Sequence, residues 1–175
     1  MSAVGAVTGA QRIEAAFAGH GKRAALMPYL MGGYPSAEQS LAAGLAAADA
    51  GADLIELGIP FSDPLADGPA IHAAGAAALD AGIRPGDVLE VCRRLSERLP
   101  VVLMVYANLV LAAGADRFVR QAVDAGADGL IVPDMPQEEA ATTRALCDAA
   151  GLALVPLVAP SSTPERVAEI GREAR

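Results

Sequence analysis

Two stretches of the chain carry nearly the same joint between two kinds of secondary structure. They read DAGADLIEL at 49–57 and DAGADGLIV at 124–132. In each, an alanine-rich helical stretch stops at a glycine, Gly51 or Gly126, which can adopt the left-handed conformation found at helix ends. A short apolar run then follows. The joint predicts a helix, a glycine and a buried strand, and a weaker copy, AAGLALVP, lies at 149–156.

Apolar runs suited to buried strands recur along the whole chain, at about 25–31, 53–57, 101–106, 129–133 and 152–156. They are apolar on both faces, as expected for parallel strands covered by helices, and helical patterns lie between them. The expected helical stripes are Leu41, Leu45 and Ala48; Phe118, Ala122 and Val123; and, before the first strand, Ile13, Ala16 and Phe17. The pattern predicts five βα units preceded by a short helix.

The loops after the strands and the spacing of the strands indicate the architecture. No GxGxxG or GxxxxGK[ST] loop follows the first strand, so a nucleotide-binding doubly wound sheet loses its main support. The rhythm favours a (β/α)₈ barrel, a fold that needs about 250 residues. With 175 residues, the chain is expected to form an incomplete barrel over 10–175, after a flexible stretch at 1–9. Its first and fifth strands would then be open edges.

Charge and composition exclude several classes of function. The chain has 13 basic and 21 acidic residues, a net charge of -8 and no basic cluster, which disfavours nucleic acid as a partner. No apolar run reaches the roughly 20 residues that span a bilayer, and the N-terminus lacks the pattern of a signal peptide. Cys92 and Cys147 have no metal-ligand spacing, so buried free thiols and no metal site are expected. These features together predict a soluble cytoplasmic protein.

The stretch IELGIPFSDPLADGP at 55–69 contains three acids. Strand alternation places Glu56 on the same face as Leu54, which would be the inside of the barrel near its carboxyl-terminal end. Burial there would raise the pKa of Glu56 and make it suitable as a general acid and base. A glutamate paired with a cation, or exposed at a strand end, is the alternative, and position alone leaves both open. Asp63 and Asp67 lie in the proline-rich loop, where Asp67 could instead cap the next helix.

The other strands are expected to bring further side chains to the same end of the barrel, where active sites of this fold lie. The inward-facing pairs predicted by alternation are Tyr29 and Met31, Met104 and Tyr106, and Val132 and Asp134. Two tyrosines at one level suit a flat apolar ligand. Ordinary packing of aromatic residues at strand ends remains the alternative.

The stretch IELGIPFSDPLADGP at 55–69 resembles the tryptophan synthase α subunit family. So do three shorter motifs: PYLMGGYP at 28–35, VYANL at 105–109 and VPDMP at 132–136. The motifs occur in the family's order and spacing. The resemblance implies a TIM barrel and a lyase of tryptophan biosynthesis that cleaves indole-3-glycerol phosphate to indole and glyceraldehyde 3-phosphate. The reaction is a retro-aldol cleavage that needs no cofactor in this subunit.

Residue by residue, the resemblance implies that Glu56 transfers protons and that Asp67 binds the indole N–H and stabilises positive charge on the ring. The positions matching substrate-binding residues are Tyr29, Met104, Tyr106 and Asp134. Those matching the surface that faces the β subunit, which carries pyridoxal phosphate in an α2β2 complex, are Pro60, Phe61, Asp63, Pro64 and Asn108. The phosphate-gripping loops of the family belong to later strands than these. A non-catalytic fragment that binds the β subunit is therefore the alternative function.

Overall fold

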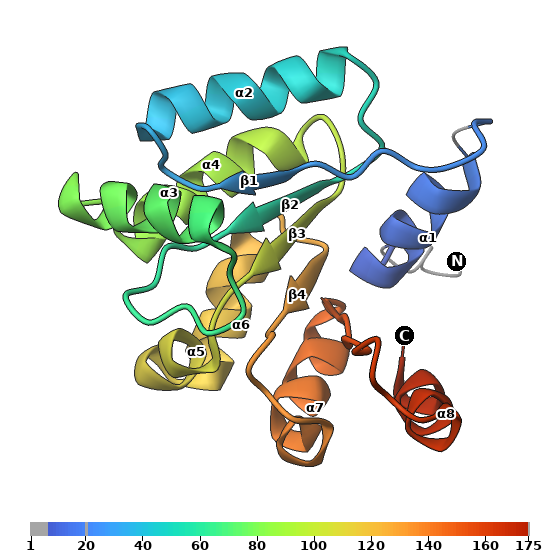
Figure 1. Ribbon diagram of the computed structural model, residues 1–175. Helices are drawn as coiled ribbons and strands as arrows, with labels where there is room; N and C mark the ends of the chain where they lie inside the picture. Colours follow the sequence, from blue (N-terminus) through green and yellow to red (C-terminus); the bar gives the residue numbers. More distant parts are fainter. Residues whose placement is uncertain (1–6, 20, 175) are drawn as a thin grey trace, which may run out of the picture.

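The computed structural model describes residues 7–19 and 21–174, and in these residues five parallel strands form one sheet (Figure 1). The strands are paired in chain order, β1-β2-β3-β4-β5. Their bounds are β1 Tyr29–Met31, β2 Ile55–Gly58, β3 Val101–Met104, β4 Gly129–Ile131 and β5 Ala153–Leu154. Four of them lie inside a predicted apolar run and are shorter than it, and β2 extends one residue beyond its run, to Gly58. The five predicted βα units are confirmed, with β1 and β5 as the edges of the sheet.

Helices precede, connect and follow the strands, and α2, α4, α6 and α7 supply the core on one face of the sheet. Their bounds are α1 Gly9–Gly19, α2 Ala37–Asp49, α3 Pro69–Asp80, α4 Pro85–Ser96, α5 Ala107–Ala113, α6 Ala115–Asp124, α7 Ala141–Ala150 and α8 Pro164–Glu173, with a 3₁₀ turn η1 at Gln137–Glu139. The pairs α2–α4, α4–α6 and α6–α7 each make contact (Figure 1). The predicted N-terminal helix is α1. Of the stretch expected to be flexible, 1–6 lie outside the described residues.

The glycine joints have the predicted conformation. Gly51 follows α2 with φ of 91°, and Gly126 follows α6 with φ of 75°. Gly126 is also sterically constrained, because a Cβ built there would lie 2.3 Å from Ser96 Oγ. The positive φ reverses the chain so that the next residues enter β2 and β4. The repeated sequence joint therefore marks two real helix-to-strand turns.

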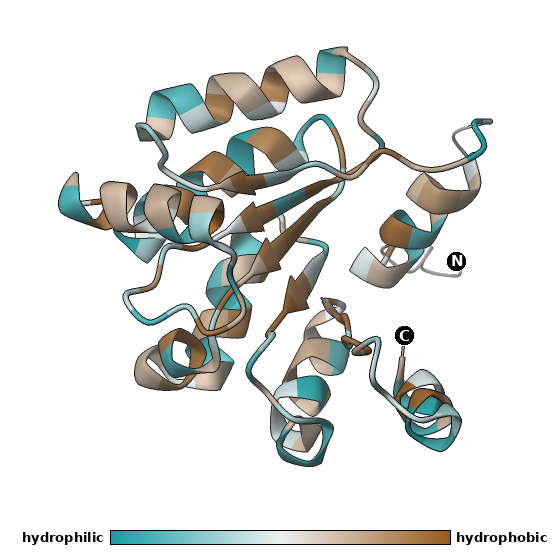
Figure 2. Cartoon of the chain, viewed as in Figure 1, coloured by the Kyte–Doolittle hydropathy of each residue, from teal (hydrophilic) through white to brown (hydrophobic). Residues whose placement is uncertain are grey.

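The two faces of the sheet differ in how they are covered. Alternate strand residues such as Ile55, Leu57 and Leu103 belong to the large core between the sheet and its helices. The opposite, inner face has a small cluster of Leu54, Val102 and Ile131, against which Met104 and side chains of α1 pack. Figure 2 shows the strands as the most continuously hydrophobic part of the chain. The inner face is the one on which the predicted site must be found.

Three predicted orientations are wrong. Val132 packs in the helix-side core, and Ile131 is the inward residue, because Ile131 is in register with Met104 on β3. The stripe of α6 uses Val119 in place of Val123, which is 37% exposed. Phe17 is also exposed, so the apolar side chains with which α1 packs on the inner cluster are Ile13 and Ala16. The β4 error is a shift of one position within a strand of three residues.

A buried carboxylate attaches α1 to the sheet. Asp128 Oδ2 accepts a hydrogen bond of 3.0 Å from the Val101 backbone N–H, and its Oδ1 lies 3.1 Å from Arg12 Nη1. Burial raises the pKa of Asp128, while the Val101 hydrogen bond and Arg12 oppose that rise. The close approach also requires Gly9, where a Cβ would lie 1.9 Å from the Asp128 carbonyl oxygen. Sequence reasoning missed this pair, because its partners come from distant segments.

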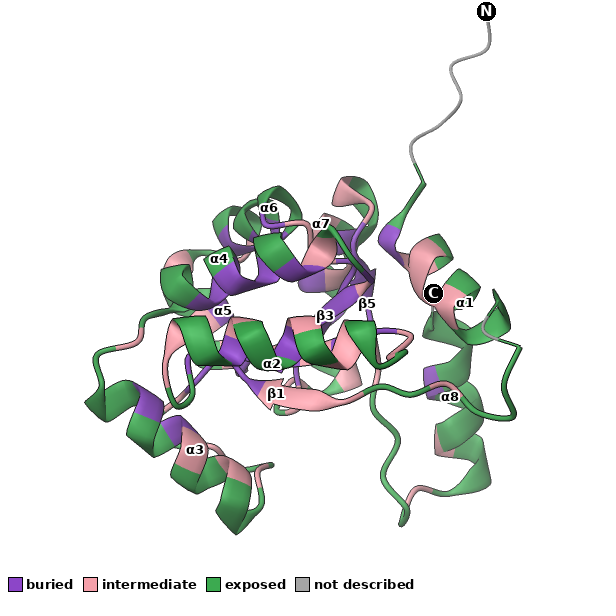
Figure 3. Ribbon diagram, turned by 90° about the horizontal axis from the view of Figure 1, so that it is seen from above, coloured by how far each residue is buried: buried purple, intermediate pink, exposed green. Residues whose placement is uncertain are grey.

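Cys92 and Cys147 are free and buried, as predicted. Among the described residues, no helix has the length and apolar character required to cross a membrane. No group of three or more His, Cys, Asp or Glu side chains in these ranges is placed to hold a metal ion. Figure 3 shows α3 exposed on most of its surface, with Gly75 and Ala78 as its buried residues.

Candidate active site

The candidate site is built on β2 and on the loop that leaves it. Glu56 is in register with Tyr29 of β1 on one side and with Val102 of β3 on the other. The three positions share the inner face, since in-register residues of parallel strands point the same way. Glu56 is therefore flanked by Leu54 and Val102 of the inner cluster, with the carboxyl end of the strand one residue beyond its neighbour Leu57.

The surroundings of Glu56 bear on the two interpretations of this residue. Its side chain is half-buried, and burial raises the pKa of the carboxyl group above its ordinary value. Within the described residues, no salt bridge or hydrogen bond joins its carboxylate to another side chain. A glutamate neutralised by a cation is thus not what the structure contains. A raised pKa at a partly open strand end is the property that a proton-transfer group requires.

Asp67 is brought to the same place by the loop after β2. The loop runs from Ile59 to Gly68, and α3 starts at Pro69 with Gly68 as its N-cap, which makes no side-chain capping bond. The expected alternative of Asp67 as a helix cap is therefore wrong. Its carboxylate is instead close enough to raise the pKa values of two tyrosines, Tyr29 and Tyr106, after the larger effect of burial on each.

Tyr29 faces both acids. Burial raises the pKa of its hydroxyl most, and the nearby charges of Asp67 and Glu56 and the hydroxyl of Tyr106 raise it further. The Tyr29 Oη atom is buried and has no hydrogen-bond partner among the described residues. Tyr29 thus lies near Glu56, Asp67 and Tyr106, and Tyr106 lies near Asp67. We call these four side chains the acid–tyrosine cluster. A buried unpartnered hydroxyl beside two carboxylates is suited to a ligand that supplies the missing partner.

Gly58 is what allows Tyr29 to lie this close to β2. A Cβ built on Gly58 would be 1.9 Å from Tyr29 Oη and 2.7 Å from its Cζ, distances at which the ring must move. A larger residue at the end of β2 would therefore displace Tyr29 from the acid–tyrosine cluster.

We expect Gly58→Ala to lower the free energy of unfolding by about 1–3 kcal/mol, the usual cost of overpacking. Urea denaturation would measure it. Gly86→Ala is the matched control, because a Cβ at Gly86 meets nothing within 4 Å. In a Tyr29→Phe background, where the closest clash is absent, the cost of Gly58→Ala should be smaller. An equal cost in both backgrounds would contradict the assignment of the clash to the Tyr29 hydroxyl.

The remaining residues matched to substrate binding lie at different distances from this cluster. Met104 is half-buried on the inner face, as alternation predicts. Tyr106 is only 2% exposed, and its hydroxyl oxygen accepts a hydrogen bond from the Ala66 backbone N–H. Asp134 is exposed, and its Oδ1 accepts a hydrogen bond of 2.8 Å from the Ala107 backbone N–H at the start of α5. Its carboxylate therefore stabilises a helix end in this structure.

The residues matched to the partner surface also differ in availability. Asp63 and Asn108 are exposed; Asp63 lies in the loop after β2, and Asn108 lies in the first turn of α5, which follows β3. Pro64 is half-buried, and the Phe61 ring stacks on Tyr106. Pro60 is buried within the chain, so it can shape the loop but presents no surface to a partner.

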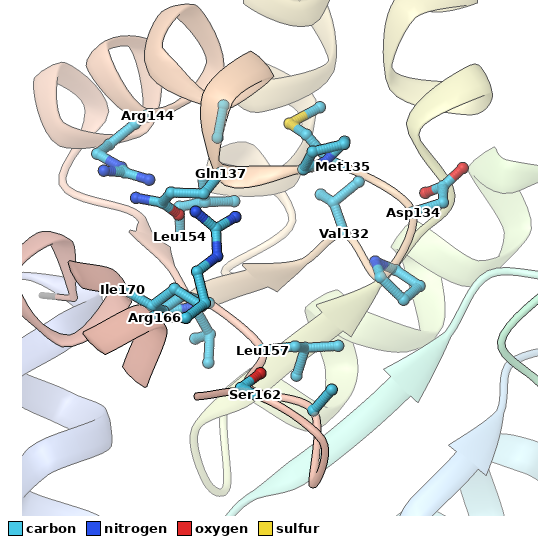
Figure 4. A pocket seen from close by; sticks show the side chains of 16 residues that line it. Val132, Asp134, Met135, Gln137, Arg144, Leu154, Leu157, Ser162, Arg166 and Ile170 are labelled. Atoms are coloured by element: carbon cyan, nitrogen blue, oxygen red, sulfur yellow. The ribbon is translucent and has the colours of Figure 1, made fainter. Parts of the chain in front are cut away.

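A separate pocket of about 380 Å³ lies over the ends of β4 and β5, between α7 and α8 (Figure 4). Its lining includes Asp134 but neither Glu56 nor Asp67. Two arginines in it, Arg144 and Arg166, were not singled out from the sequence. Both are ion-paired: Arg144 with Glu173, and Arg166 Nη1 with Glu138 Oε1 at 2.8 Å and with Glu169. These pairs attach α8 to the neighbouring helix and turn.

The fold defines a class of protein: an α/β protein of the TIM-barrel type, here with one acid near the carboxyl end of β2 and a second acid in the loop that follows. The sequence profile described as "Tryptophan synthase alpha chain" matches residues 16–175. The chain belongs to the tryptophan synthase alpha chain family, whose members are lyases of tryptophan biosynthesis. This confirms the fold class and the family expected from the sequence motifs.

Individual relatives agree with this assignment. The tryptophan synthase alpha chain of Methanosarcina acetivorans is 49% identical over 149 residues, which cover 85% of this chain and 55% of the relative. That of Roseiflexus sp. is 50% identical over 151 residues, 85% of this chain and 58% of the relative. The chain thus spans somewhat more than half the length of the curated relatives that it matches.

Solved structures give the same result. A crystal structure of tryptophan synthase from M. tuberculosis in an aminoacrylate-bound form superposes with a TM-score of 0.88 and 42% identity over 94% of this chain and 68% of that one. The tryptophan synthase complex from Pyrococcus furiosus gives a TM-score of 0.81 and 35% identity over 86% of this chain and 63% of that one.

Proposed function

We propose that this chain contributes the acid–base part of the site that cleaves indole-3-glycerol phosphate to indole and glyceraldehyde 3-phosphate. The observation that carries the proposal is the position of Glu56: half-buried on the inner face, with a raised pKa, and in one cluster with Asp67. The chain's membership of the family supports the reaction class, and the cluster supplies the groups that this class needs.

In the proposed reaction the two acids have different tasks. Glu56, in its protonated form, gives a proton to C3 of the indole ring, and the ring nitrogen then carries positive charge. Asp67 accepts a hydrogen bond from the indole N–H and stabilises that charge. A carboxylate then takes the proton of the adjacent glycerol hydroxyl, the bond from C3 to the side chain breaks, and its electrons return to the ring. The side chain leaves as an aldehyde, so no oxidant or reductant is consumed.

The same cluster supplies the binding surface in this proposal. Tyr29 and Met104 offer apolar faces to the indole ring, and the unpartnered Tyr29 hydroxyl offers a hydrogen bond. Asp134 lies at the rim, where the glycerol end would extend. The chemistry requires no cofactor in this chain. Pyridoxal phosphate would belong to a partner β subunit in a cytoplasmic α2β2 complex.

A second candidate function is a non-catalytic module that binds the β subunit. The observation that favours it is the exposure of Asp63, in the loop after β2, and of Asn108, in the first turn of α5. The solved relative from Pyrococcus furiosus is a tryptophan synthase complex. In this function Asp63 and Asn108 would contact the partner, and Glu56 and Asp67 would take no part in a reaction.

One experiment separates the two functions. Indole release from indole-3-glycerol phosphate would be measured with this chain alone and with a purified tryptophan synthase β chain, and binding to the β chain would be measured by calorimetry. We expect indole release, and we expect Glu56→Gln to lower its rate by about 10²-fold or more. Binding without any release would favour the second function. The absence of both release and binding would contradict both functions.

A further inference from the structure

Tyr106 lies where β3 passes into α5, and it is the N-cap residue of that helix. Its side chain is among the largest fully buried ones in the molecule, at 2% exposure. The resemblance to the family suggests a residue that lines the substrate pocket. A ring with so little free surface has little left to offer a ligand, so its contacts within the chain must explain its position.

Two contacts connect Tyr106 to the loop that carries Asp67. The Phe61 ring stacks on it with centroids 5.1 Å apart and an interplanar angle of 26°. The Ala66 backbone N–H donates a hydrogen bond of 3.0 Å to Tyr106 Oη. Phe61 and Ala66 lie near the two ends of the loop, with Pro64 between them. One side chain therefore holds the loop at two points, one apolar and one polar.

The hydroxyl also reaches the acid itself. Its oxygen accepts from Ala66, so its proton is available to an acceptor, and Asp67 is close enough to raise the pKa of Tyr106 after the larger effect of burial. Asp67 follows Ala66 directly, so it is held in place through the Ala66 backbone and lies near the same hydroxyl. Loss of the hydroxyl would remove the hydrogen-bond acceptor of the Ala66 N–H and the polar neighbour of the Asp67 carboxylate.

We propose that Tyr106 is a positioning residue that holds the 61–67 loop against the end of β3, so that Asp67 stays within the acid–tyrosine cluster. The claim about the loop stands on geometry alone. Its consequence for catalysis rests on the proposed function. The competing view is that the ring is ordinary core packing and that the loop keeps its place through its prolines and its connection to α3.

Hydrogen exchange of the whole chain, followed residue by residue by NMR, distinguishes these views without an activity assay. In Tyr106→Phe the ring and the stack remain and only the hydroxyl is lost. We expect the Ala66 amide to exchange about three- to tenfold faster, the factor that corresponds to one net hydrogen bond. Amides of β3 such as Leu103 should keep their rates, which would show that the change is local.

Tyr34→Phe is the matched control, because Tyr34 is exposed in another loop and the same hydroxyl is removed there. It should leave the Ala66 rate unchanged. Phe61→Leu, which removes the stack and keeps the hydroxyl, should speed exchange at 61–63. An unchanged Ala66 rate in Tyr106→Phe would overturn the proposal. Where indole release is measurable, Tyr106→Phe should lower kcat more than it changes KM. Absence of release would bear on the proposed function and leave the exchange result decisive for the loop.

Discussion

Glu56→Gln is expected to lower the rate of indole release by about 10²–10⁴-fold, the contribution typical of a positioned general acid or base. Glutamine has nearly the same shape but cannot exchange a proton with indole C3 or with the glycerol hydroxyl. The rate would be measured with a β chain present, at saturating substrate. Glu97→Gln is the matched control, because Glu97 is exposed at the end of α4, remote from the inner face.

The same variant has an expected effect on stability that needs no substrate. Burial raises the pKa of Glu56 in the folded chain above its ordinary value of 4.5, so the folded state favours the protonated form. The stability that this preference contributes is fully present below the unfolded pKa and is lost as pH rises through the folded pKa. Glutamine is neutral throughout. Glu56→Gln should therefore raise the free energy of unfolding at pH 7 and change it little at pH 4.

Urea denaturation at the two pH values would test this, with Glu97→Gln showing no such difference. A variant that is less stable than the parent at pH 7 would mean that the Glu56 carboxylate makes a favourable contact when ionised. A variant that releases indole at the parental rate would remove Glu56 from the proposed chemistry. The two results are independent, because one reports the folded chain and the other the reaction.

The parts of the fold that could be predicted are those with a local cause. Gly51 and Gly126 stand where a helix must reverse into a strand, and the positive φ that this needs selects glycine in the sequence itself. The inward direction of Glu56 follows from the alternation of a strand whose other residues are clearly apolar. Both could therefore be derived before any distance was known.

The parts that could not be predicted depend on register between distant segments. The assignment of Val132 failed because β4 is only three residues long, and a shift of one position reverses every side chain. The contact between Ala66 and Tyr106 joins residues on different βα units, and no pattern in either segment shows it. The aromatic residue could be placed at the strand end from the sequence, but its use of the hydroxyl on the loop could not.

Asp67→Asn is expected to lower the rate of indole release by about 10²–10³-fold, comparable to the loss of one preorganised group that stabilises transition-state charge. Asparagine keeps the size of the side chain and can still accept a hydrogen bond from the indole N–H and from Tyr106. It lacks the negative charge opposite the ring when C3 is protonated. The effect should therefore appear in kcat, with KM changed much less. Asp80→Asn, at the exposed end of α3, is the matched control.

The Asp67 variant also links the reaction to the loop. If Tyr106 acts by holding Asp67 in place, Tyr106→Phe should cost much less activity in the Asp67→Asn background than in the parent, because the charge that it positions is already gone. Two residues that contributed separately would give additive losses. Additivity in this double-mutant cycle would contradict a shared role, and an unchanged rate in Asp67→Asn would leave Asp67 as a residue of the loop alone. Strong coupling would show that the Ala66–Tyr106 hydrogen bond acts on the reaction through the Asp67 carboxylate.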